Sequence, residues 1–315
     1  MPTYNRAVAL LAKYYPIAGL YVVFSGLYLW LSLITPADQE TLRKYHISKG
    51  GLTVLILTIA LPYIIIWFVA LIGLLGLRDY AQAIKKSRDG AAFNVVSQGI
   101  FWLTLWLPLS AILGALTTYI YQKAPSTTAH MVQINNYGNI LLLLPAFWLC
   151  YVGTGQLIRL IRQPERTPLI MVFAFVAFAA LYTFLTLHDT SRRLPAHGVQ
   201  VASYYLPDWL IVTTIVIPRL LEWFLGFQAA YNLYLYRTKV KGKIYKRALT
   251  GLAAGLAAVV TMIAILRCLQ SLSTQLGQQS LNMLLLIIYL LLILIAVGYG
   301  LISRGARDLK RIESL

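Results

Sequence analysis

Long apolar segments separated by short polar ones dominate this chain. A helix needs about 20 residues to cross a hydrocarbon core of about 30 Å. Eight apolar segments are long enough, at residues 17–35, 52–77, 95–121, 139–161, 169–188, 209–236, 249–268 and 281–302. In lipid each backbone polar group must be satisfied internally, and these segments are too long and too continuously apolar for barrel strands. The pattern therefore predicts an all-α, polytopic integral membrane protein with eight transmembrane helices.

Composition agrees with that class. Of the 315 residues, 59% are hydrophobic and 12% are charged, which is far from the balance of a soluble domain. Residues 4–15 mix apolar, Lys and Tyr residues as in a short interfacial helix. The first span has no small-residue cleavage site after it, so we expect it to be retained. The chain also lacks N-x-Ser/Thr sequons, which favours a bacterial plasma (inner) membrane.

The basic residues predict the orientation. Polar segments on one side of the predicted spans carry 19 of the 27 Lys and Arg residues, and those on the other side carry six. The richer set lies within residues 6–13, 78–88, 159–166, 237–247 and 304–311. By the positive-inside rule, the N- and C-termini are expected in the cytoplasm. Because these cations lie at helix ends, anionic lipid headgroups account for the net charge of +17 better than nucleic acid does.

Similar segments recur in order along the chain. The matched pairs are 27–33 with 181–187, 61–68 with 217–224, 111–113 with 264–266, and 153–155 with 298–300. Apolar segments match by chance more readily than polar ones, but a Pro-to-Trp-Phe spacing is identical in the second pair. A duplication would give a parallel 4+4 repeat, because four spans return the chain to its starting side. The expected halves are 1–168, with the interfacial helix, and 169–315, with the basic cytoplasmic tail.

Arg219 and Glu222 are the opposite charges nearest the middle of a predicted span. A charge at the bilayer centre costs roughly 2.5 to 3.5 kcal/mol on insertion scales, so such residues face a bundle interior or a wet cavity. Gly226 and Ala229 continue the same helical face and let a neighbouring helix approach. The pair can be structural, fixing helix register, or it can belong to a binding site.

Three neighbouring residues complete the candidate ligand-binding set. Pro218 has no N–H to donate and crowds the preceding turn, which leaves backbone carbonyls near Thr214 available to a ligand or water. Gln228 continues the polar content of the helix, and Tyr63 occupies the position in the second span that corresponds to Arg219. Elsewhere, Gly251-x-x-x-Gly255 in the seventh span predicts a close helix contact.

Other chemistries have weaker support. The four histidines lie in or beside the loops opposite the basic ones, without the spacing of a metal site, and no span holds facing histidines for haem or a mid-helix lysine for a Schiff base. The two cysteines form no Cys/His cluster. We therefore expect no metal, no cofactor and no catalytic residues, and an enzyme is the less favoured class because hydrolase motifs are absent.

These features predict a carrier or channel for a small solute, with anions among the candidates and a polar midplane site on the sixth helix. The alternative is a non-catalytic membrane scaffold or sensor whose basic cytoplasmic loops bind a partner or anionic lipid. A cavity that reaches Arg219 would favour the carrier. A pair sealed among packed side chains would favour the scaffold.

Overall fold

A computed structural model describes residue 19 and residues 21–32, 48–123, 128–161, 167–188, 208–275 and 281–313, and every regular element within them is helical. The long helices are α3 (Lys49–Ala83), α4 (Arg88–Lys123), α5 (Thr128–Leu160), α6 (Leu169–Leu187), α8 (Ile217–Lys239), α9 (Lys243–Gln275) and α10 (Leu281–Glu313). A short helix, Tyr21–Ser32, precedes α3. Helix α7 (Asp208–Ile211) and a π-helix, η4 (Val212–Val216), lead directly into α8.

The helices account for the predicted spans. Within the described residues, seven helices are long and apolar enough to cross a membrane, and Tyr21–Ser32 is a shorter apolar helix at the place of the first predicted span. The chain is therefore an all-α polytopic membrane protein with seven to eight apolar helices. The predicted interfacial helix at 4–15 lies outside the described residues.

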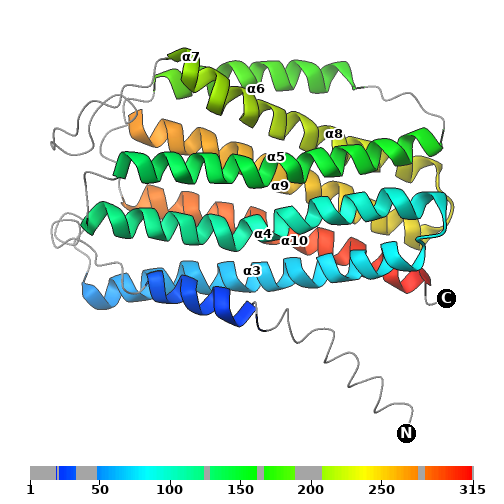
Figure 1. Cartoon of the computed structure of the whole chain (residues 1–315), viewed down its shortest axis with the longest axis horizontal. Coiled ribbons are helices and arrows are strands. Elements are labelled where there is room, and N and C mark those ends of the chain that lie inside the picture. Colours follow the sequence, from blue (N-terminus) through cyan, green and yellow to red (C-terminus); the bar gives the residue numbers. More distant parts are fainter. Residues whose placement is uncertain are drawn as a thin grey trace, which may run out of the picture.

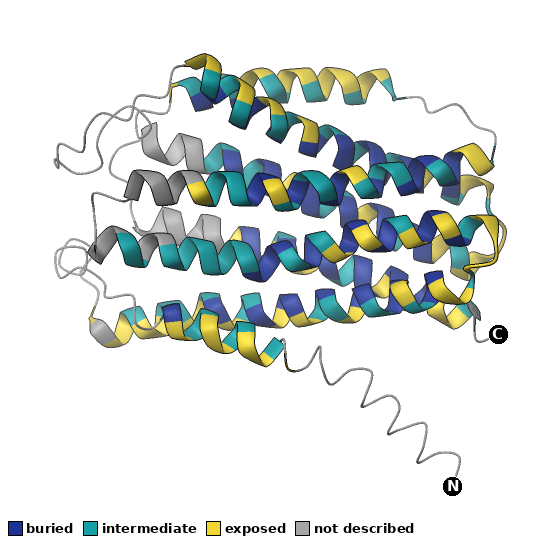
Figure 2. Cartoon of the chain, in the orientation of Figure 1, coloured by how far each residue is buried: buried dark blue, intermediate teal, exposed yellow. Residues whose placement is uncertain are grey.

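Six of the helices form a closed ring. In order of contact, α3 packs on α4, α4 on α5, α5 on α8, α8 on α9, α9 on α10, and α10 on α3 again. Figure 1 shows these helices running nearly antiparallel along the long axis of the molecule. The buried residues lie where the helices face one another, and the exposed apolar residues lie on the outside (Figure 2). This is the distribution expected when the outer surface meets lipid.

Two helices lie outside the ring and contact it through aromatic side chains. In α6 only 17% of the most apolar stretch is buried, against 56% in α9. The ring centroids of Phe24 and Trp67 are 5.7 Å apart, and those of Phe178 and Trp223 are 5.0 Å apart. Helix Tyr21–Ser32 thus packs on α3, and α6 contacts α8 through aromatic rings and also lies against α9 and η4.

Glycine allows α9 and α10 to approach closely. A Cβ added at Gly255 would lie 2.6 Å from the carbonyl oxygen of Gly298, and one at Gly251 would lie 3.0 Å from that of Leu301. No side chain fits between backbones at the shorter distance. The helix contact predicted from the Gly251-x-x-x-Gly255 spacing is confirmed.

A tyrosine connects two helices that are not consecutive in the ring. Tyr299 of α10 is fully buried, and its hydroxyl donates a hydrogen bond to the carbonyl oxygen of Leu103 in α4 at 2.8 Å. Helices α4 and α10 both flank α3, so this bond passes through the inside of the ring.

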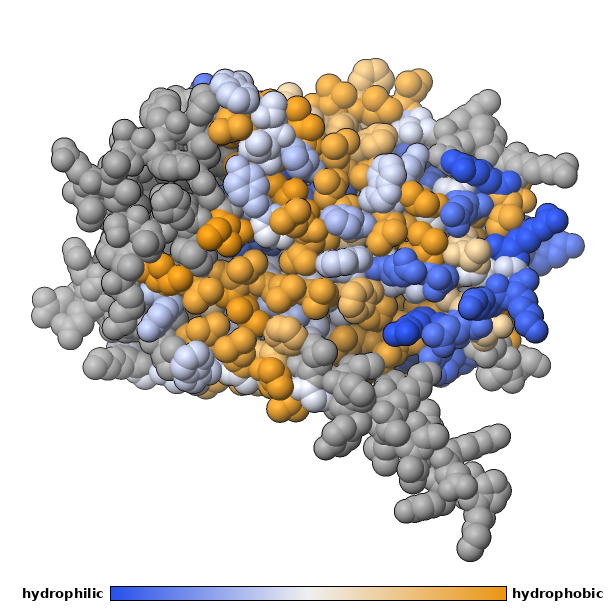
Figure 3. Space-filling view, in the orientation of Figure 1, coloured by the Kyte–Doolittle hydropathy of each residue, from blue (hydrophilic) through white to orange (hydrophobic). Residues whose placement is uncertain are grey.

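Polar bonds join the helices at the basic end of the bundle. They are Arg247 Nε to Asp308 Oδ2 (2.8 Å), Lys310 Nζ to Asp79 Oδ2 (2.7 Å), and Tyr236 Oη to Asp89 Oδ2 (2.8 Å). Several helices continue past the predicted spans at this end, as α10 does from 302 to Glu313. The apolar band of the molecule and the hydrophilic end beyond it are visible in Figure 3.

Candidate functional site

Arg219 and Glu222 form a buried ion pair in the first turn and a half of α8. Arg219 Nη1 donates to Glu222 Oε2 at 2.9 Å, and the two side chains are 1% and 0% exposed. The spacing of three residues brings both side chains to the same helical face, as the sequence predicts. Both point into the bundle, where water does not reach them.

A neighbouring helix supplies the second partner of the arginine. Arg219 Nη2 donates to the backbone carbonyl oxygen of Asn136 in α5 at 3.1 Å. Helices α5 and α8 are adjacent in the ring, so the guanidinium bridges two helices that belong to different predicted halves. Asn136 lies three residues before the start of the fourth predicted span, in the part of α5 that precedes it.

The backbone before Arg219 departs from α-helical geometry. Residues Val212–Val216 form a π-helix in which the Ile217 N–H donates to the Val212 carbonyl, five residues earlier. Pro218 follows in the first turn of α8, where its missing N–H is tolerated. The wider turn gives the proline ring room against the preceding carbonyls. Single π-helical turns are frequent at functional sites.

A group of polar residues in α5 lies beside the pair and was missed by the sequence analysis. The Tyr137 hydroxyl is 3.1 Å from Thr214 Oγ1 in η4. Asn139 accepts a hydrogen bond from Trp106 Nε1 at 2.6 Å and donates to the Asn135 carbonyl at 2.6 Å. The signal was present as a run of polar residues at 135–139, but the span was predicted to begin at 139. The helix begins a full three turns earlier, at Thr128.

A third buried charge belongs to the same region. Arg267 of α9 is 8% exposed and interacts electrostatically with both Glu222 and Tyr63. Arg267 is at the end of the seventh predicted span, 249–268, and was not among the candidate site residues. Tyr63 itself forms a hydrogen bond with Ser110 of α4 at 3.3 Å. Tyr63 thus lies in the electrostatic surroundings of the pair without a direct contact to it.

Gln228 belongs to a separate polar cluster. Its side-chain nitrogen donates to Asn232 Oδ1 at 3.1 Å, and its oxygen accepts from Thr167 at 2.9 Å. Asn232 in turn contacts Thr154 of α5 at 3.5 Å. Protein groups therefore engage both ends of the Gln228 amide, and the structure does not bring it together with Arg219.

One atom of the pair lacks a partner. The second carboxylate oxygen of Glu222, Oε1, is buried and accepts no hydrogen bond from any described group. The indole N–H groups of Trp67 and Trp223 are also buried and donate to no described group. These two tryptophans occupy matched positions in the two predicted halves. A buried polar atom without a partner costs about 1 to 3 kcal/mol, so each such atom calls for an explanation by water, a proton or a ligand.

The arrangement supports binding chemistry better than catalysis. A guanidinium held by two oxygens is a fixed positive centre, and a carboxylate with one open oxygen can accept a proton or a donor group. No protein-family model, curated protein or solved structure matches the chain.

Proposed function

We propose that this chain is a carrier for a small solute, with the ion pair of α8 as its polar site. The membrane is proposed to be the bacterial inner membrane, with both termini in the cytoplasm and anionic headgroups around the basic end. Burial of the pair supports a carrier in a closed state over an open channel, because a conducting pore would leave its polar lining exposed to water. Anions remain the first solute class to test, since Arg219 is the fixed positive charge and the open Oε1 of Glu222 can take a proton that enters with the anion.

The observation that carries the proposal is the unpartnered Oε1 of Glu222. A pair that served only to join helices would gain from satisfying both carboxylate oxygens, since one left open in a dry core is costly. Here the open oxygen lies next to a π-helix and a proline, on a helix whose regular bonding is already interrupted. Interrupted helices at the interface of two repeats are where carriers bind their solutes.

A parallel 4+4 repeat of 1–168 and 169–315 is part of the proposal. Its support is that the contacts between the halves come in equivalent pairs: α5 packs on α8, and α10 packs on α3. Each interface includes a Tyr–Thr hydrogen bond, Tyr137 with Thr214 (3.1 Å) and Tyr289 with Thr58 (2.7 Å). Thr58 and Thr214 are separated by the same offset of 156 as Trp67 and Trp223.

The second candidate is a non-catalytic scaffold or sensor, and the sealing of the pair favours it. With the Arg219 and Glu222 side chains 1% and 0% exposed, the two charges can act as a register device between α5 and α8. The basic end would then bind a partner or anionic lipid. The carrier and the scaffold predict different effects on folding when one charge of the pair is removed.

The test compares Glu222→Gln and Arg219→Gln with the double variant, each purified and reconstituted into vesicles of phosphatidylethanolamine and phosphatidylglycerol. Uptake of chloride, nitrate, acetate and phosphate is measured, together with folded yield. Thr213→Val, an exposed change on η4, is the matched control. For a carrier we expect folded singles whose uptake of one of these anions falls at least about tenfold, equivalent to about 1.4 kcal/mol.

A scaffold gives the opposite pattern. Breaking a desolvated pair costs roughly 3 to 5 kcal/mol, so the singles should fold poorly and the double variant should recover. Folded singles with uptake equal to that of Thr213→Val would reject the ion pair as the site of transport.

A further inference from the structure

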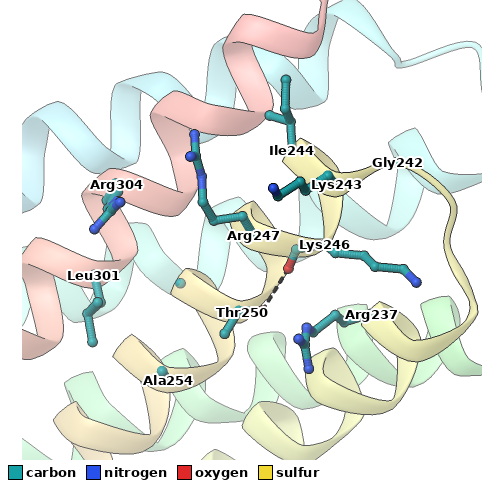
Figure 4. A pocket seen from close by; sticks show the side chains of 11 residues that line it. Arg237, Gly242, Lys243, Ile244, Lys246, Arg247, Thr250, Ala254, Leu301 and Arg304 are labelled. Atoms are coloured by element: carbon teal, nitrogen blue, oxygen red, sulfur yellow. Dashed lines mark hydrogen bonds between the residues drawn. The ribbon is translucent and has the colours of Figure 1, made fainter.

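An open groove lies on the outer surface of α9 at the basic end of the bundle. Its volume is about 930 Å³, and its walls come from the end of α8, the first three turns of α9 and the middle of α10. Figure 4 shows basic side chains from all three helices around it. The five basic residues are Arg237, Lys243, Lys246, Arg247 and Arg304.

Among the described residues, no acidic side chain lines the groove. Arg247 is bound by Asp308, whose carboxylate lies in an adjacent smaller cavity that Arg247 and Arg304 also line. Among the described residues, no ion pair engages Arg237, Lys243, Lys246 or Arg304. These four cations without an ion-pair partner repel one another, and a bound anion would relieve that repulsion. The guanidinium carbon of Arg237 also lies 5.6 Å from the centroid of the Tyr234 ring.

Two further features, one of the backbone and one of a side chain, favour anion binding in this groove. The first turn of α9 has no acidic residue, whereas the first turn of α4 contains Asp89. The positive end of the α9 dipole is thus left without a counter-charge from its own helix. In addition, Arg237 Nε is buried and has no hydrogen-bond partner in the described part of the chain.

The remainder of the lining is apolar or small and leads towards the membrane-spanning surface. Leu301, Ala254 and Ile244 line the groove, and Val297, one turn from Leu301, is 49% exposed on the outside of α10. A cationic rim joined to an apolar floor matches an amphiphile whose headgroup lies at the interface and whose chains lie in the bilayer. A soluble anion would use the rim and leave the apolar floor uncovered.

The geometry points to a specific lipid site in this groove, for a headgroup that carries two phosphate charges. The rim residues Arg237, Lys243, Lys246 and Arg304 bind the phosphates, and the α9 terminus adds backbone donors. The acyl chains follow the outer faces of α9 and α10. This site is independent of the ion pair of α8.

The experiment titrates the full-length protein, in neutral detergent, with cardiolipin as the two-phosphate probe. Native mass spectrometry counts bound lipids and thermal unfolding measures the shift in Tm; phosphatidylcholine and phosphatidylglycerol are the lipid comparisons. The triple variant Lys243→Gln, Lys246→Gln, Arg304→Gln removes three exposed groove cations. The matched control, Lys85→Gln, Lys86→Gln, Arg88→Gln, removes three exposed cations from the same end outside the groove.

We expect the groove variant to bind cardiolipin at least about tenfold more weakly than the control variant, since each basic residue near an anionic surface contributes measurably. Without lipid, both variants should have the same Tm, because each loses only exposed charges. Equal loss of binding in the two variants would overturn the site in favour of general surface charge. Competition by pyrophosphate or by a polyglutamate peptide, at concentrations equal to the lipid, would overturn the lipid assignment.

Discussion

At the scale of single residues, Asn139 organises the polar part of α5 that lies beside the ion pair. Its amide is fully used, accepting from Trp106 Nε1 and donating to Asn135. The adjacent turn carries Asn136, whose carbonyl holds Arg219. Removing a partner of Asn139 should therefore be costly, because the oxygen left behind is buried.

The change Trp106→Phe tests this. It leaves the Asn139 carbonyl oxygen without its donor, and we expect a loss of about 1 to 3 kcal/mol in unfolding free energy from that unsatisfied group. Trp102→Phe is the matched control on the same helix, since Trp102 is only half-buried. Thermal unfolding in one detergent gives the comparison. Equal losses in the two variants would show that ring volume, rather than the hydrogen bond, decides the effect.

The sequence identifies some of these residues and not others. Arg219 and Glu222 could be predicted because a charge in an apolar segment must face inward. The partner of Arg219 is a backbone carbonyl, which no side-chain pattern reveals. Arg267 was not among the candidates because a cation near a span end can also extend to the headgroups. Gln228 lies apart from Arg219 because nearness along α8 is not nearness in space.

At the scale of elements, the close packing of α9 on α10 depends on the absence of a side chain at Gly255. Gly255 faces Gly298 at a distance that excludes a Cβ, whereas a Cβ at Gly300 on α10 would meet nothing within 4 Å. The two glycines therefore provide a matched pair in adjacent helices.

Gly255→Ala should destabilise the fold by about 1 to 3 kcal/mol, because the helices must separate to admit the methyl group. Gly300→Ala should be neutral or stabilising by up to about 1 kcal/mol, since alanine favours the helix. Chemical denaturation in detergent measures both. A Gly255→Ala variant as stable as Gly300→Ala would contradict the close contact between α9 and α10.

Elements differ in how well their boundaries follow from sequence. Hydropathy gives the apolar length of each span, but α4 begins and α10 ends in polar sequence, where Asp89 and Asp308 bond to neighbouring helices. The sequence predicts available backbone carbonyls before Pro218, but not the π-helix that contains them. The position of the π-helical turn depends on contacts with another helix, such as the hydrogen bond between Tyr137 and Thr214.

At the scale of the whole molecule, the succession of antiparallel helices makes a definite topology testable. Reporter fusions at Asp89, Glu165 and Leu315 should report cytoplasm, because they lie in or next to the basic segments. Fusions at Ala129 and Ser273 should report the opposite side. Activity reporters with opposite compartment requirements serve as mutual controls, and a reversed result at any two sites would contradict the orientation.

The buried Tyr299 of α10 limits the turnover rate of the proposed transport. Because Tyr299 bonds to α4 inside the ring, the solute of the proposed carrier could cross there only after packed groups separate. Collective motions of this kind take microseconds to milliseconds. Turnover would then be limited to roughly a thousand to a million events per second, with no stepwise current in a planar bilayer at any voltage. Unitary conductance steps from the reconstituted protein would show instead that ions pass without any such rearrangement.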